Sequence, residues 1–330
     1  MIATLGATLE TLAVLAAASA CASLLVGPIL AGVRRLPVAP AIRADLALGA
    51  AALPTAAVVL VAIAIALPGG LDLLGVRADH CNEHGGHGHL CLAHPAVATP
   101  ALVALGALVA AGAALRAGRW AAARFIAARD LAELLRLGRS DPDRADVVRL
   151  DASAVLCHAA GAFSPRVLIS TRLVAELAPD LLPAALEHER AHVRRRDVLA
   201  RDVISVLGLL AWPGVPTAAA GAWEEAAEEA ADAEAAERFG GHVLARALVA
   251  VARMSLGPAP SAHSWSGMPF VGARLTRRVE ALLERPPRRR PALALAMVPA
   301  LGLAIAVLAA VYADPLHHAA ETALHVLLGA

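Results

Sequence analysis

The sequence PAALEHERAHVRRRDVL, at residues 183–199, decides how the rest of the chain is interpreted. It contains the motif HExxH, formed by His188, Glu189 and His192. Residues four positions apart lie on one face of an α-helix, so both imidazoles can bind the same metal ion. Glu189 directly follows the first histidine and can reach a water bound to that metal. The stretch therefore predicts a metal-binding helix, and the alternative is a solvated helix with two chance histidines.

An acidic helix is expected at residues 223–240, WEEAAEEAADAEAAERFG. A catalytic zinc bound by HExxH needs a third protein ligand, and we choose Glu228, which begins the pattern E-x-x-A-D. Asp232, one turn later on the same face, can hold a ligand histidine through its second ring nitrogen. Glu225 and Glu229 lie on a neighbouring face and are expected to be solvated.

The composition indicates a membrane protein with a soluble portion. The chain has 330 residues, of which 58% are hydrophobic and 17% charged, and its mean hydropathy is +0.64. A soluble chain would carry about 25% charged residues. The net charge of +1 gives no indication of nucleic-acid binding.

Four stretches are apolar and long enough to cross a bilayer, at residues 9–31, 48–67, 99–115 and 291–313. Arginines cluster between the first two stretches, after the third and before the fourth, and basic loops face the cytosol. The N-terminus is then outside and the protein is a multi-pass protein of the cell membrane. The predicted regions are residues 1–117 with three spans and an outer loop at 69–98, a cytosolic domain at 118–287, a last span at 288–313 and an outer tail at 314–330.

The apolar stretch at residues 198–222 separates the two motifs. A crossing there would place them about 30 Å apart across the bilayer, although both must meet at one metal. We therefore expect a membrane-associated helix that lies against the bilayer or re-enters it. Short strands are expected at residues 147–156 and 166–170. The fold class is mainly α, a multi-span helical membrane protein with a cytosolic gluzincin-like α+β zinc peptidase domain containing a small sheet.

The outer loop is rich in histidine and cysteine. Cys81 and Cys91 either form a disulfide or join the nearby histidines in a loop that binds Zn or Cu. Cys21 and Cys157 are expected to be buried thiols that act as small hydrophobic side chains.

Several stretches together resemble the membrane-embedded zinc metallopeptidases of the beta-lactam and methicillin-resistance sensor (BlaR/MecR antirepressor) type. They are HERAHVRRRD at 188–197, Ala211-Trp212-Pro213, the E-x-x-A-D pattern, FSPRVLISTRLVAEL at 163–177 and RLTRRVEALL at 274–283. The resemblance implies Zn²⁺ bound by His188, His192 and Glu228, with Glu189 as the general base. It also implies signal-dependent cleavage of a cytosolic protein, such as a transcriptional repressor, or of the protein itself.

The family's sensor members carry a penicillin-binding domain after the last span, and only about 17 residues follow residue 313 here. Beta-lactam sensing is therefore not implied. Two alternatives stay open: a CAAX-processing or heat-shock membrane protease, and a non-catalytic membrane metal sensor. The expected partners are the lipid bilayer and a cytosolic protein substrate, with a homodimer left open.

The expected reaction is peptide hydrolysis, with the substrate added as an extended chain to the edge of the sheet near residues 166–170. The residue that stabilises the oxyanion is left open among His158, His242 and the run Arg194 to Arg196.

Overall fold

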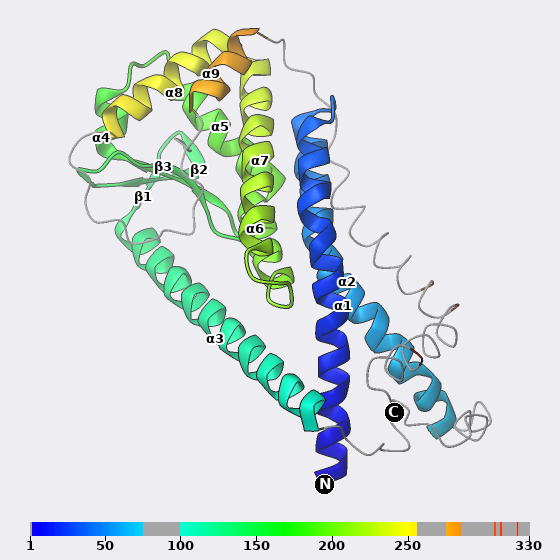
Figure 1. The fold of residues 1–330 in the computed structure, drawn as a ribbon. Coiled ribbons are helices and arrows are strands. Elements are labelled where there is room, and N and C mark those ends of the chain that lie inside the picture. Colours follow the sequence, from blue (N-terminus) through cyan, green and yellow to red (C-terminus); the bar gives the residue numbers. More distant parts are fainter. Residues whose placement is uncertain are drawn as a thin grey trace.

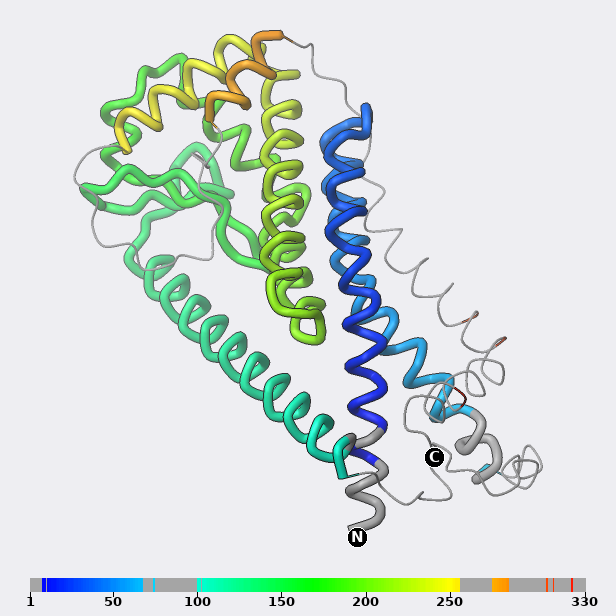
Figure 2. Tube along the Cα trace, viewed as in Figure 1, coloured from blue at the N-terminus to red at the C-terminus, as the bar shows by residue number. Residues whose placement is uncertain are grey.

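The computed structural model describes residues 2–74, 100–255 and 275–284, together with residues 307, 311 and 322. Figures 1 and 2 show long N-terminal helices and, beside them, a domain in which helices pack around a small sheet. The described chain is mainly helical with one mixed sheet, so this part of the predicted fold class is confirmed.

The first two helices are the most apolar. They are α1 (Ile2–Arg35) and α2 (Pro40–Leu73), which lie side by side in Figure 1. Within them, Thr11–Arg35 and Pro40–Leu67 are long and apolar enough to cross a membrane. These stretches overlap the first two predicted spans.

The third helix, α3 (Pro100–Leu137), differs from its prediction. The sequence analysis ends the third span at residue 115 and begins the cytosolic domain at 118, and the structure continues one helix through this boundary to Leu137. Residues 116–123 contain no proline and are rich in alanine, so nothing ends the helix there. Near its start α3 approaches α1 closely, because a Cβ on Gly106 would clash with the backbone oxygen of Leu9.

The sheet has four strands, in the order β1-β2-β4-β3. Strand β2 pairs in parallel with β4, and β3 pairs antiparallel with β4. The prediction that residues 166–170 form a free edge of the sheet, where a substrate could add, is therefore wrong. Strand β4 is paired on both sides, and β3 is the outer strand. The bounds are β1 (Arg139–Asp141), β2 (Arg144–Leu150), β3 (Cys157–Ala160) and β4 (Arg166–Ser170).

The HExxH motif lies on α5 (Leu182–Arg195), which follows the short α4 (Thr171–Glu176). Pro183, in the first turn of α5, has the backbone angle that a helix start favours. The helix contacts β3 and β4 on one side and helices α7 (Val215–Phe239) and α8 (Gly241–Ser255) on the other. It is therefore buried over most of its length, which places the motif in the interior.

Residues 198–222 do not form the single helix predicted for them. They comprise most of α6 (Asp197–Leu207), a turn at 208–214 and the start of α7, and the two helices pack against each other. Both ends of this hairpin return to the domain that contains the sheet, as the distance argument requires (Figure 1).

The closed end of this hairpin, formed by the last residue of α6 and the turn, is hydrogen-bonded to all three N-terminal helices. The hydroxyl of Thr55 on α2 donates to the carbonyl of Leu207 over 2.8 Å, and Arg116 on α3 donates to the carbonyl of Ala211 over 2.9 Å. On α1, Ser19 donates to a carbonyl of the same turn and Ser23 accepts from another residue of it. The hairpin therefore reaches the middle of the first two predicted spans.

The last described helix is α9 (Leu275–Glu284), which packs on α8 and α7. The outer loop with Cys81 and Cys91, the tail and nearly all of the last predicted span lie outside the described residues. Of the other two cysteines, Cys157 is buried as expected, whereas Cys21 is exposed on α1, so that expectation is wrong.

Candidate metal centre

The two histidines of the motif point at a common position. His188 and His192 are one turn apart on α5 and are 0% and 1% exposed. Their Nε2 atoms lie 3.2 Å apart. Two nitrogens bound about 2.0–2.1 Å from a tetrahedral zinc are about 3.3–3.4 Å apart. The histidines are therefore spaced as two ligands of one metal ion would be.

Helix α7 supplies the third group. Glu228 Oε2 lies 3.5 Å from Nε2 of His188, and Oε1 lies 3.6 Å from Nε2 of His192. The candidate ligand atoms of the three buried residues all lie within 4.8 Å of one another. His188, His192 and Glu228 could therefore hold a metal ion.

Each histidine is held from behind by its own carboxylate. Asp232 Oδ1 lies 3.0 Å from Nδ1 of His188, and Asp197 Oδ2 lies 2.7 Å from Nδ1 of His192. A carboxylate at Nδ1 keeps the proton there and leaves the lone pair on Nε2. Two such lone pairs facing each other repel unless a proton or a cation lies between them, which is the condition that a metal ion meets.

Asp197 has no role in the sequence analysis. It follows Arg196, the only described residue other than glycine with a positive φ, at 55°. This left-handed residue ends α5 and turns the chain, so that Asp197 begins α6 beside His192. The signal in the sequence is an aspartate directly after the HExxH helix, but an arginine run does not predict a left-handed turn.

Arg278, on α9, is the second residue that the sequence analysis missed. It is 4% exposed and donates from Nε and Nη2 to the two oxygens of Asp232, each over 2.7 Å. Its Nη1 lies 2.7 Å from Oε2 of Glu228. The sequence signal is the basic stretch at 274–283, which is quoted for its resemblance without any residue being given a role.

These charges shift the proton affinities of the site in the metal-free structure. Burial lowers the pKa of His188, but hydrogen bonds with Asp232 and Glu228 raise it by more, to about 9. Burial raises the pKa of Asp232, but Arg278 and His188 lower it by more, so that this pKa lies well below its ordinary value. Glu228 has a lowered pKa for the same reason, since His188, His192 and Arg278 outweigh its burial. Both carboxylates are therefore ionised at neutral pH.

Glu189 lies beside this group without belonging to it. It is 0% exposed, and its Oε2 accepts a hydrogen bond from the backbone N–H of Ala159 on β3 over 2.7 Å. Its Oε1 has no hydrogen-bond partner among the described residues. Burial raises the pKa of Glu189, against the lowering effect of the nearby histidines. It is thus a buried carboxylate with one oxygen available to a water or a substrate.

The neighbouring acidic face of α7 is not solvated, contrary to expectation. The side chains of Glu225 and Glu229 are 10% and 13% exposed, and both pair with Arg277 of α9. Glu229 also pairs with Arg43 of α2. These ion pairs join α7 to α2 and α9, so the face that points away from the histidines has a structural role.

The candidates for the oxyanion-stabilising group are scattered. Arg194 pairs with Glu187 and Glu234, on the side of α5 away from the histidine ring nitrogens, and His242 is exposed. His158 lies on β3, next to the residue that contacts Glu189. Of these candidates, the structure brings His158 nearest to the centre.

No family model, no curated protein and no solved structure matches this chain. The centre is defined by its own geometry as a buried cluster of two histidines and one glutamate that could hold a metal ion. A further buried glutamate, two orienting aspartates and one arginine surround it.

Proposed function

We propose that the protein is a membrane-bound zinc metalloendopeptidase that cleaves a cytosolic protein. The observation that carries the proposal is the position of Glu189, a buried carboxylate with a free oxygen beside a cluster of three candidate ligands. A structural zinc site closes the shell with four protein ligands, whereas a catalytic site keeps one position open. Three ligands and an adjacent acid fit the catalytic arrangement.

Each residue then has a defined task in peptide hydrolysis. Zinc, when bound, polarises the substrate carbonyl and acidifies a water. Glu189 accepts a proton from that water and passes it to the leaving amine, and its raised pKa suits a group that must both take up and release a proton. Asp232 and Asp197 keep the Nε2 lone pairs of the two histidines directed at the metal position.

The outer edge of β3 is the proposed substrate-binding strand. Ala159 directs its N–H away from β4 and toward Glu189, so the unpaired edge of the sheet runs along the centre. An extended peptide that pairs with this edge would bring its backbone carbonyl close to Glu189. This assignment replaces the expected position at β4, which is internal.

The membrane placement is proposed from the two apolar helices and the arginines that flank them. Thr11–Arg35 ends with Arg34 and Arg35, and Arg43 follows in α2. Basic residues at this end favour the cytosolic side, where the peptidase domain also lies in this arrangement. Single cysteines at Arg35 and Ala220, in a chain with Cys21, Cys81, Cys91 and Cys157 all replaced by alanine, should resist impermeant reagents in intact cells. Labelling of either position from outside would contradict the topology.

The likeness to the BlaR/MecR type supports a regulatory role, in which the enzyme cleaves a repressor or itself in response to a signal. The test is a comparison of protein cleavage products in cells that carry the wild type or Glu189→Gln. Products that depend on Glu189 would identify the substrate. Identical products in both cells would instead favour a metal-binding protein without peptidase activity.

A further inference from the structure

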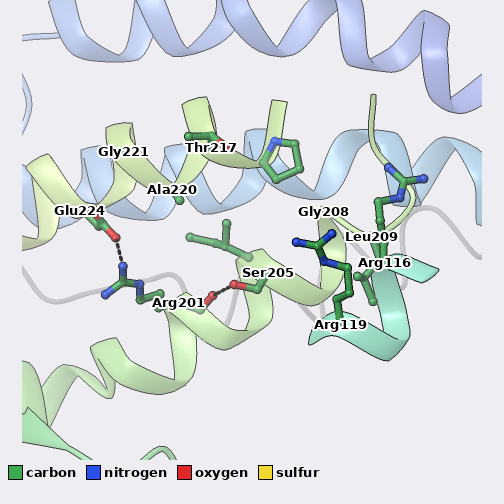
Figure 3. A pocket seen from close by; sticks show the side chains of 12 residues that line it. Arg116, Arg119, Arg201, Ser205, Gly208, Leu209, Thr217, Ala220, Gly221 and Glu224 are labelled. Atoms are coloured by element: carbon green, nitrogen blue, oxygen red, sulfur yellow. Dashed lines mark hydrogen bonds and ion pairs between the residues drawn. The ribbon is translucent and has the colours of Figure 1, made fainter. Parts of the chain in front are cut away.

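A pocket lies between α3, α6 and the first turns of α7, away from the metal centre. Its volume is about 610 Å³. Figure 3 shows Arg201 and Glu224 at one end and Arg116 with Leu209 at the other, with the Arg119 side chain reaching between them. The proposed peptidase reaction gives this pocket no role.

The pocket has an excess of positive charge. Of its charged lining residues, three are arginines and one is a glutamate. Arg201 is paired with Glu224, with Nη2 and Oε1 2.9 Å apart, and Arg116 donates to a backbone carbonyl. Arg119 is exposed, and no acidic partner for it is found among the described residues. One guanidinium in the pocket is therefore available to an anion.

Two contacts between α3 and the α6–α7 hairpin border the pocket, and neither of them involves Arg119. One turn or so further along α3, Arg124 Nη2 lies 3.1 Å from Oδ2 of Asp202 on α6. Toward the other end of the pocket, Arg116 bonds to Ala211 in the hairpin turn. These two contacts join α3 to the hairpin on either side of Arg119, so the space around Arg119 is maintained by the fold.

The rest of the lining is suited to an amphiphile. Leu209, Pro216 and Ala220 give the pocket an apolar wall. On α3, Leu108 and Leu115 are 71% and 64% exposed and lie on the face that leads to Arg119, at spacings of seven and four residues. An acyl chain lying along these leucines would bring its headgroup to Arg119.

The position of the pocket along α3 agrees with this ligand. Arg116 and Arg119 are the first charged residues after the apolar start of α3, the third predicted span at residues 99–115, so a lipid chain on that stretch would have its headgroup beside them. Anionic lipids are concentrated in the cytoplasmic leaflet, and basic pockets between helices on that side bind their headgroups.

We propose that this pocket binds the headgroup phosphate of an anionic phospholipid from the cytosolic leaflet, with Arg119 as the principal contact. The inference rests on the membrane placement of the proposed function. The lipid would fill the space between α3 and the α6–α7 hairpin. Two residues of the candidate metal centre lie on the same helices, since Asp197 begins α6 and Glu228 lies further along α7.

Native mass spectrometry of the purified full-length protein tests the site, with phosphatidylglycerol and phosphatidylcholine offered in equal amounts. The wild type should retain phosphatidylglycerol in preference. Arg119→Ala should weaken this retention about tenfold, because it removes a charge-assisted hydrogen bond to phosphate. Gly221→Leu fills the pocket from α7, since a Cβ there meets no atom within 4 Å, and should reduce retention while every arginine stays in place.

Arg129→Ala is the matched control, because Arg129 is an exposed arginine of α3 outside the pocket, and it should retain lipid like the wild type. Equal retention by Arg119→Ala and Arg129→Ala would overturn the proposal, as would equal retention of the two lipids by the wild type. Displacement of phosphatidylglycerol by low concentrations of inorganic phosphate would show a free-phosphate site instead.

Zinc content, measured on the same samples, separates this inference from the proposed function. A protein that holds zinc but shows no lipid preference contradicts the lipid site alone. A protein that prefers phosphatidylglycerol but holds no zinc contradicts the peptidase proposal alone.

Discussion

Arg278 and Asp232 form a buried two-pronged ion pair that joins α9 to α7 beside His188, with Asp232 Oδ1 3.0 Å from Nδ1 and Arg278 Nη2 3.4 Å from Nε2. The pair places a permanent positive charge next to two ionised carboxylates, which would otherwise be costly to bury without a metal. It also ties the metal centre to the helix that precedes the last predicted span.

We expect Arg278→Gln to destabilise the metal-free protein by about 3–5 kcal/mol, the usual effect of removing one partner of a buried ion pair. Zinc should recover part of this loss, because its charge also compensates the carboxylates. The free energy of unfolding from denaturant titration in detergent, with and without zinc, is the measurement. Arg277→Gln is the control: Arg277 is half exposed, and its loss should cost about 1 kcal/mol or less. Equal losses for the two variants would argue against a special role for Arg278.

The aspartates behind the histidines should matter for zinc binding. Asp197→Asn and Asp232→Asn should each lower zinc affinity by about 10–100-fold, since each replaces the charged acceptor that orients one ring with a weaker, neutral amide. Zinc titration of the purified variants measures this. Asp180→Asn, at an exposed surface pair with Arg246, should leave zinc affinity unchanged. An Asp197 variant with wild-type affinity would show that the 2.7 Å contact does not orient His192 for the metal.

Two adjacent glutamates on α7 should behave differently. Glu228→Gln should lower zinc affinity sharply, because an amide is a much weaker ligand than a carboxylate. Glu229→Gln should keep zinc but weaken the contacts with Arg43 and Arg277, at a cost of about 1 kcal/mol in unfolding free energy. Zinc titration and denaturant unfolding of both variants distinguish the roles. Loss of zinc in the Glu229 variant with retention in the Glu228 variant would reverse the ligand assignment.

The parts of the site that follow helix periodicity could be predicted from the sequence. The spacing of His188 and His192 depends only on which residues share a side of a helix. The choice of Glu228 over Glu229 depends also on Asp232 one turn later and on the resemblance of the E-x-x-A-D pattern. The structure brings these residues together. The solvation of Glu229 could not be predicted, because its partners Arg43 and Arg277 come from helices that only the tertiary fold places beside α7.

The other differences between the predicted and the observed structure come from contacts between residues that are far apart in the chain or joined by an unusual backbone turn. Arg278 is 46 residues from Asp232 in the chain, so no local pattern indicates their pairing. The strand order places β4 inside the sheet because β2 pairs with it in parallel, and a parallel pair leaves no turn signal between its strands. Asp197 reaches His192 only through the left-handed Arg196, a conformation that an arginine seldom adopts.

The pH dependence of the metal-free protein should report on His188. Its pKa is raised from 6.5 to about 9, so the protonated ring stabilises the folded state fully below about pH 6.5. This contribution should be lost as the pH rises toward 9, and unfolding free energy in the presence of a chelator should fall over that interval. Zinc binds the deprotonated ring, so zinc affinity should rise over the same interval. A His188→Gln variant should lack the stability change, and a wild type with flat stability between these pH values would contradict the assignment.

The central claim is that Glu189 acts as a base beside a zinc ion that it does not bind. The direct test measures zinc content and peptide-bond cleavage of purified wild type and Glu189→Gln, on a substrate identified in cells or on the chain itself. The account predicts about one zinc per chain in both proteins and a cleavage rate lower by about 10²–10⁴-fold, or more, in the variant. A variant that holds zinc and cleaves at the wild-type rate, or one that loses zinc together with activity, would contradict it.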